Sequence, residues 1–407
     1  MKEFEFLKLA KLLILGLLSQ SGSLYGFSFN EAMQAIEGHP KVKVLHSRHE
    51  ALSQKAISDG SWGDPRLKIA AKNLPKDSLG RSETPMSGIE LSLSQKIALS
   101  NKFGDLRRAG VNSSDSILWN SRSAVEGLRK ELWNLLIEVQ KTYEQKAILR
   151  ENYQWIENMI SVSEKLYSTG KINQEALLEL KIRKSELRSS LTVKEFQIQS
   201  FQEDIKYLLG EGKVIEMPTV PWSFLTESNK ALDSKERSLQ SRLKAKEFAL
   251  SAAKKELIPD LTLSVGYTSR SYDDQLGDLV TVAATIPIPS SGKRYANKKV
   301  ALEERKQLEL GLRDYRRQKE SKIGKLKILK EKVKAELEIL ESTTIKFAEN
   351  ARKVVSKSYQ LGSATYSELL QTEFKLQNLK LNRTQKMAEL RSVYVETKYI
   401  RGEKLYE

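Results

Sequence analysis

Two stretches in the second half of the chain alternate between apolar and polar residues. The apolar positions are Leu261, Leu263, Val265 and Tyr267 in the first stretch, and Val280, Val282, Ala284, Ile286 and Ile288 in the second. A period of two residues predicts β-strands with one apolar face and one polar face. The polar segment between them contains Gly277, so we expect the two strands to form a hairpin.

A second hairpin of the same kind is predicted earlier in the chain. Its apolar positions are Leu67, Ile69 and Ala71, followed after a polar loop by Ile89, Leu91 and Leu93. The loop contains Pro75, Gly80 and Pro85, which favour turns. Because two isolated strands do not form a stable sheet, each hairpin needs further partners.

Helical spacing of apolar residues accounts for most of the remaining chain. We expect helices from Phe29 to Ser58, from Asn101 to Tyr167 and from Asn173 to Leu209. At 1.5 Å per residue the second of these would be about 100 Å long. In the third, steps of three and four from Leu177 to Leu208 give eight apolar positions in ten, the pattern of a helix packed lengthwise against partners.

The second half of the chain repeats the first. Residues 94–102 resemble residues 285–293, 191 positions later, and Tyr167-x-x-Gly170 precedes Tyr359-x-x-Gly362 by 192 positions. Each half therefore reads as helix, strand, strand, very long helix, tight turn and long helix. We expect a first repeat at 24–209, a joint at 210–234 and a second repeat at 235–407.

The N-terminus predicts export from the cytosol. Lysines precede the short apolar run Leu12 to Leu18, and small polar residues follow it, so residues 1–23 read as a signal peptide. The alternative is an amphipathic helix of a cytosolic protein. No other run approaches the ~18 apolar residues of a transmembrane helix. The sequence contains no cysteine, which excludes disulfides and thiol chemistry.

Basic residues exceed acidic ones by 68 to 52, a formal charge of +16. The densest patch, Arg313 to Lys334, has Tyr315 as its sole aromatic residue, so it lacks the stacking side chains of a single-strand nucleic-acid binder. A solvated helix face is the preferred interpretation, and no nucleic-acid partner is predicted.

No catalytic or metal-binding arrangement is predicted. His39, His46 and His49 are the three histidines, and without a fixed set of nearby carboxylates they are interpreted as ordinary surface residues. No pairing of nucleophile and base, Gly-rich phosphate loop or metalloprotease spacing is present. We therefore expect no enzyme activity, no cofactor and no bound metal.

Three features point to a known family: the order of elements, the Ser-Gly-Lys-Arg run at residues 291–294, and the two Tyr-x-x-Gly turns followed by Leu-Leu. In these features the chain resembles the TolC-like outer-membrane efflux proteins, over the whole mature chain. Residues 62–67 and 73–75 resemble the metal-cation branch of that family. The resemblance implies a mostly α fold with a small β part. Long coiled-coil helices would form a periplasmic α-barrel, and each subunit of a homotrimer would give four strands to a shared twelve-stranded outer-membrane β-barrel.

The resemblance also implies a function, that of a passive exit duct for drugs or metal cations. An inner-membrane pump would deliver the substrate through a periplasmic adaptor protein. The apolar strand positions Leu261, Leu263, Val265, Tyr267, Val280, Val282, Ala284 and Ile286 would then face lipid. The rival interpretation is an envelope coiled-coil scaffold that binds acidic polymers through its basic helix faces.

Two further sets of residues receive roles from the resemblance. The turn residues Tyr167, Gly170, Lys171, Tyr359, Gly362 and Ser363 would contact the adaptor. Glu368 and Gln371 would lie at the tunnel entrance. Glu368 matches the acidic residue of that region, whereas Gln371 departs from members that carry a second acid there. Three copies of Glu368 around a threefold axis would repel one another, which raises the pKa of the ring.

Overall fold

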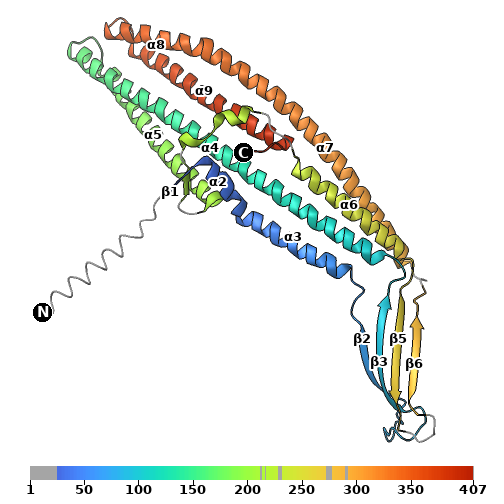
Figure 1. Ribbon diagram of the computed structural model, residues 1–407. Helices are drawn as coiled ribbons and strands as arrows, with labels where there is room; N and C mark the ends of the chain where they lie inside the picture. The colour runs from blue at the N-terminus through green and yellow to red at the C-terminus, as the bar shows by residue number, and fades with distance from the viewer. Residues whose placement is uncertain are drawn as a thin grey trace, which may run out of the picture. The chain divides into compact units, whose positions relative to one another are not determined.

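A computed structural model describes residues 25–210, 213–215, 217–227, 232–271, 277–288 and 292–406. Long helices make up most of the described chain, together with a four-stranded and a two-stranded sheet (Figure 1). The signal peptide predicted for residues 1–23 lies outside the described residues. The fold class expected from the sequence, mostly α with a small β part, is confirmed.

The elements follow the predicted order. The first part of the chain contains β1 (Tyr25–Phe27), α2 (Phe29–Ala35), a 3₁₀ turn (Ile36–Gly38), α3 (Pro40–Asp59), β2 (Arg66–Lys72), β3 (Gly88–Ile97), α4 (Lys102–Ser168) and α5 (Gln174–Leu209). The second part contains β4 (Lys213–Ile215), 3₁₀ turns at Met217–Thr219 and Trp222–Thr226, α6 (Ser234–Lys255), β5 (Leu261–Ser269), β6 (Leu279–Thr285), α7 (Lys293–Ile339), a π-helical turn (Leu340–Thr344), α8 (Ile345–Gln360) and α9 (Tyr366–Arg401).

The structure corrects three details of the prediction. The first predicted helix is divided into α2 and α3, because Pro40 has no backbone N–H to continue a helix but suits the first turn of a new one. The π-helical turn interrupts the second very long helix. Strand β6 ends at Thr285, so Ile286 follows the strand, and Pro287 lacks the N–H for a further ladder bond.

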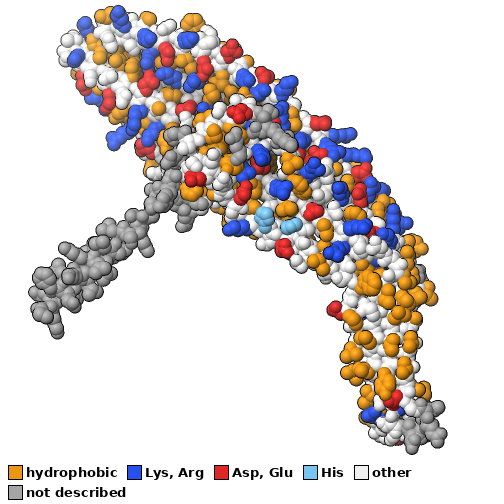
Figure 2. Space-filling model, in the orientation of Figure 1, with side chains coloured by type: hydrophobic (Ala, Val, Ile, Leu, Met, Phe, Trp, Pro, Cys, Tyr) orange, Lys and Arg blue, Asp and Glu red, His pale blue; other side chains and the backbone are white. Residues whose placement is uncertain are grey.

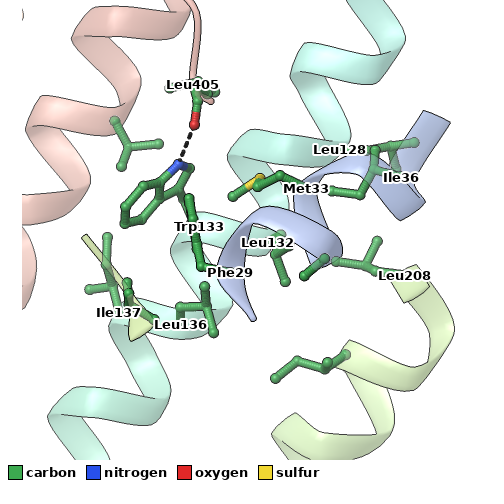
Figure 3. Packing of buried hydrophobic residues seen from close by; sticks show 14 of the residues in the cluster. Phe29, Met33, Ile36, Leu128, Leu132, Trp133, Leu136, Ile137, Leu208 and Leu405 are labelled. Atoms are coloured by element: carbon green, nitrogen blue, oxygen red, sulfur yellow. Dashed lines mark hydrogen bonds between the residues drawn. The ribbon is translucent and has the colours of Figure 1, made fainter. Parts of the chain in front are cut away.

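The chain forms two compact units. The first comprises Met1–Val42, Ser123–Asp233 and Gln318–Glu407, and its core is centred on the fully buried Trp133 of α4 (Figure 3). The indole N–H donates to the carbonyl oxygen of Leu405 at 2.9 Å, and the Trp133 ring centroid lies 4.7 Å from that of Phe29. This contact ties the C-terminal segment to α4.

The segment at 210–234, interpreted as a joint, contributes to this core. Val220, Phe224 and Leu225 are buried in the same cluster as Trp133, and β4 pairs in parallel with β1. The packing of this segment into the core could not be predicted from hydrophobic periodicity, because the segment is too short and irregular to show a helical or strand period.

The second unit comprises Lys43–Arg122 and Ser234–Arg317. It contains the four-stranded antiparallel sheet, in the order β2-β3-β5-β6, together with all of α6 and parts of α3, α4 and α7. Helix α3 lies close to α4, because a Cβ added at Gly110 would be 2.5 Å from the Cβ of Ala56. Asp105 of α4 accepts hydrogen bonds from Lys255 Nζ and Ser251 Oγ of α6, both at 2.6 Å.

Asp105 is almost fully buried, yet it stays ionised more readily than a free aspartate. Burial acts against the charged form, but the hydrogen bonds from Lys255 and Ser251 outweigh it and lower the pKa of Asp105. The ion pair therefore fixes α4 against α6 within this unit.

Candidate functional site

One face of the four-stranded sheet is apolar and exposed. The strand register aligns its side chains in rows across the sheet: Ile69, Leu91, Tyr267 and Val280 form one row, and Leu67, Leu93, Val265 and Val282 form the next. Val282 is 74% exposed, and the other members of both rows are exposed as well. Hydrophobic side chains gather over the strands in Figure 2. Both predicted hairpins thus contribute to one apolar surface.

The expected lipid-facing residues belong to this surface with one exception. Leu261, Leu263, Val265 and Tyr267 lie in β5, and Val280, Val282 and Ala284 lie in β6, where Leu263 pairs with Ala284. Leu261 is only partly exposed, at the start of its strand. Ile286 is exposed but lies beyond β6.

The opposite face of the sheet is polar. Ser264, Gly266 and Thr281 lie there, and Lys72 Nζ on β2 is 2.8 Å from Glu90 Oε2 on β3. The Glu90 side chain is only 8% exposed, because its neighbours cover it. A sheet with one exposed apolar face and one polar face does not match a soluble two-layer domain, in which the apolar face is covered.

The sheet has two open edges. Among the described residues, β2 pairs only with β3, and β6 pairs only with β5. Exposed edge strands present unpaired N–H and C=O groups that favour pairing with another strand. None of the helices in the described part of the chain carries an apolar stretch long enough to cross a bilayer.

The two helix turns lie side by side in the first unit. Gly170 and Gly362 have φ of +69° and +78°, the left-handed conformation that the tight reversals require. A Cβ added at Gly362 would be 3.6 Å from Lys171 Cδ, and Tyr366 Oη donates to Glu175 Oε1 at 3.4 Å. The structure therefore brings together the turn residues that the repeat predicted.

The two tyrosines of these turns differ, although the repeat suggested equal roles. Tyr167 is 46% exposed, whereas Tyr359 is fully buried and its hydroxyl lies 2.7 Å from Ser163 Oγ. The Tyr359 side chain is therefore enclosed by its own chain, and Tyr167 offers the exposed ring of the pair. Ser363 and Lys171 are exposed.

Glu368 has a local partner that the motif analysis missed. Glu368 Oε2 accepts hydrogen bonds from the Thr365 backbone N–H at 2.8 Å and from Thr365 Oγ1 at 3.0 Å, and Thr365 Oγ1 accepts from the Glu368 N–H at 3.3 Å. This capping box starts α9. The backbone hydrogen bond is the main cause that lowers the pKa of Glu368. The spacing Thr365-x-x-Glu368 before an apolar run is the signal that could have identified it.

Glu373 and Gln377 were also missed. Glu373 is 3% exposed on α9, and Gln377, one turn further on, accepts a hydrogen bond from Arg183 Nη2 of α5 at 2.7 Å. Both lie on the buried face of α9: Glu373 between Leu369 and Leu376, and Gln377 directly after Leu376. The sequence signal that could have identified them is a polar residue at a position where the helical pattern predicts an apolar core residue. Gln371, by contrast, is exposed.

The histidines are only partly as expected. His39 is 5% exposed, so its interpretation as a surface residue is wrong. His49 Nδ1 lies 2.8 Å from Ser114 Oγ, and His46 Nε2 lies 3.3 Å from Ser121 Oγ. Within the described ranges, no three His, Cys, Asp or Glu side chains come together as a metal site would need.

Comparison with solved structures identifies the fold. No protein-family model and no curated protein sequence matches this chain. The outer membrane protein VceC from Vibrio cholerae matches with a TM-score of 0.75 at 15% identity, over 92% of this chain and 96% of that one. The chain has the TolC-like fold. CusC matches with a TM-score of 0.75 at 14% identity, over 94% of this chain and 96% of that one.

The open state of the MtrE outer membrane channel from Neisseria gonorrhoeae matches with a TM-score of 0.67 at 12% identity, over 93% of this chain and 89% of that one. CusC and MtrE are channel proteins. The likeness in fold therefore extends over more than nine tenths of this chain in each of these three comparisons.

Proposed function

We propose that this chain is one subunit of a homotrimeric outer-membrane channel and acts as a passive exit duct, not as an enzyme. The duct would release small substrates, drugs or metal cations, that an inner-membrane pump delivers through a periplasmic adaptor. The mature chain would follow cleavage of residues 1–23, with repeats at 24–209 and 235–407 around the joint at 210–234. Its helices would lie in the periplasm.

The exposed apolar face of the sheet carries this proposal. Burial of a Val, Leu, Ile or Phe side chain is favourable by about 1.5–3 kcal/mol, so a folded protein does not leave two full rows of them in water without a partner. Lipid fits the surface, because the alternation is regular and the opposite face is polar, as in strands that separate a bilayer from an aqueous pore.

The open edges support an assembly of several subunits. Four strands are too few to close a barrel around a pore, whereas three chains with four strands each would give twelve and leave no edge. The edges β2 and β6 would then pair between neighbouring subunits.

The adjacent turns at Gly170 and Gly362 supply the proposed adaptor surface. The exposed residues Tyr167, Lys171 and Ser363 would make the contact, together with the backbone at the two glycines. Glu368 and Gln371 follow the second turn on α9 and would line the entrance.

Cell fractionation with unheated gel electrophoresis tests the proposal. The mature chain should appear in the outer-membrane fraction and migrate as a trimer that heating converts to the monomer. Recovery as a soluble periplasmic monomer would contradict it and would favour the scaffold interpretation.

A further inference from the structure

An open polar cavity lies at the surface of the second unit, between α3, α4, α6 and α7. Its volume is about 440 Å³, which is in the range of small-molecule sites. Arg48 of α3 and Arg242 of α6 line it and are exposed to solvent, and Lys246 of α6 and Glu304 of α7 line it as well. Neither the apolar sheet face nor the helix turns take part in it.

The cavity has an excess of positive charge. Lys246 Nζ is 2.7 Å from Glu304 Oε2, so these two groups neutralise each other. Arg48 and Arg242 have no carboxylate within ion-pair distance among the residues that the structure describes. The two guanidinium groups therefore leave a net charge of +2 on the walls, and each offers a planar set of N–H donors that matches a carboxylate or sulfonate.

The other walls combine amide groups and apolar side chains. Asn120 and Gln307 carry N–H₂ donors that make no hydrogen bond to the described part of the protein. Leu52, Ile117 and Leu308 provide apolar surface in the same cavity. A ligand that satisfies all of these groups has an anionic head and an apolar body.

From this arrangement we infer that the cavity binds an amphipathic organic anion, whose carboxylate or sulfonate pairs with Arg48 and Arg242. As a statement about binding, the inference stands on the cavity alone. As a statement about cargo, it rests on the proposed function, because it adds small organic anions to the substrates of the duct.

Calorimetric titration of the purified full-length protein in detergent tests the inference. The probe is 2-naphthoate, and 2-naphthylmethylammonium serves as its cationic counterpart of similar size. Micelles without protein supply the blank for partition into detergent. We expect naphthoate to bind with a measurable Kd that rises with salt concentration, and the ammonium compound to bind far more weakly.

Two variants locate the site. Arg48→Gln and Arg242→Gln should each raise the Kd of naphthoate about tenfold, as expected for the loss of a charge-assisted hydrogen bond. Arg237→Gln is the matched control, because Arg237 lies on α6 and is exposed like Arg48 and Arg242, but it does not line the cavity. It should leave the Kd unchanged.

Three outcomes would overturn the inference. They are equal affinity for the anion and the cation, equal affinity of the wild type and the Arg48→Gln/Arg242→Gln double variant, and competition by inorganic phosphate at the same concentration as naphthoate. Because the titration requires no channel, a failure here is distinct from a failure to find the trimer in the outer membrane.

Discussion

Tyr359 donates a hydrogen bond to Ser163, 196 positions earlier in the chain, across 2.7 Å. The direction follows from the second bond of the serine, since Ser163 Oγ lies 2.7 Å from the carbonyl oxygen of Met159. A serine hydroxyl can donate one hydrogen bond, and Ser163 donates it to the Met159 carbonyl oxygen. The tyrosine hydroxyl is therefore the donor in the bond between the two hydroxyls. Both side chains are fully buried, and the bond joins α4 to α8 next to the paired turns.

Removal of the Tyr359 hydroxyl and removal of the Ser163 hydroxyl should therefore lower the free energy of unfolding by different amounts. Tyr359→Phe leaves Ser163 bonded to Met159 and should lower the free energy of unfolding by about 0.5–1.5 kcal/mol. Ser163→Ala leaves the tyrosine O–H buried without an acceptor and should cost about 1–3 kcal/mol. Urea unfolding followed by tryptophan fluorescence measures both, since Trp155 packs against the same cluster. Equal costs, or a larger cost for Tyr359→Phe, would contradict the assigned direction.

The apolar sheet face predicts a difference between neighbouring positions. Val265→Arg and Val282→Arg place a charge on the face proposed to meet lipid, and each should destabilise the assembled protein by about 2–4 kcal/mol near the bilayer midplane. Ser264→Arg is the matched control on the polar face of the same strand. The amount of heat-sensitive trimer in outer-membrane fractions gives the readout. Similar losses from both faces would show that the sheet does not border lipid.

Much of the fold could be predicted from the sequence because its elements are long and periodic. The period of two in Leu261 to Tyr267 and the heptad steps from Leu177 gave the strand and the helix in their correct places. The 192-residue offset between the Tyr-x-x-Gly motifs predicted the second turn from the first. Such patterns are local, so they do not depend on which surfaces later pack together.

Site chemistry was harder to predict because it depends on those contacts. Tyr167 and Tyr359 occupy equivalent positions in the repeat, yet only Tyr359 packs against α4 and loses its exposure. Likewise, His39 carries no sequence signal for burial, which depends on the neighbours that the fold places around it, Tyr207 among them with a ring centroid 5.4 Å away. The role of Glu368 as a helix cap could have been predicted from the sequence, because the capping motif depends only on residues three positions apart.

Glu373 predicts how stability depends on pH. Burial is the main cause that raises the pKa of this carboxyl, with Arg352 opposing it and Glu151 adding to it. Arg352 Nη1 is 3.6 Å from Glu373 Oε2, too far for a hydrogen bond, and neither oxygen accepts one within the described structure. A carboxyl with a raised pKa in the folded state stabilises the fold in its protonated form.

This contribution is present at low pH and is lost as the pH rises through the folded-state pKa. Glu373→Gln keeps the shape of the protonated form, so its advantage over the wild type in urea midpoint should grow between pH 5 and pH 8. Glu349→Gln, on neighbouring α8, is the control, and its difference from the wild type should not follow the same trend. An advantage of Glu373→Gln that is constant with pH would mean that Glu373 does not titrate in this range.

The last prediction separates two roles of Glu368. If three copies line a tunnel entrance, their negative charge attracts cations, and its removal should change the conductance and ion preference of the channel in planar bilayers. The capping box complicates the substitution by alanine, because Glu368→Ala removes the charge and also the acceptor for the two Thr365 donors. Glu368→Gln removes the charge alone, since glutamine also completes such a box.

We therefore expect both variants to shift ion preference away from cations, and only Glu368→Ala to lower the unfolding midpoint. Gln371→Glu adds an acid one turn further along α9 and should shift the preference toward cations. The hydrogen bonds from Thr365 lower the pKa of Glu368 and so oppose the rise expected from repulsion within a ring. If Glu368→Gln trimers conduct with wild-type ion preference, the carboxylate caps α9 and does not form part of the gate.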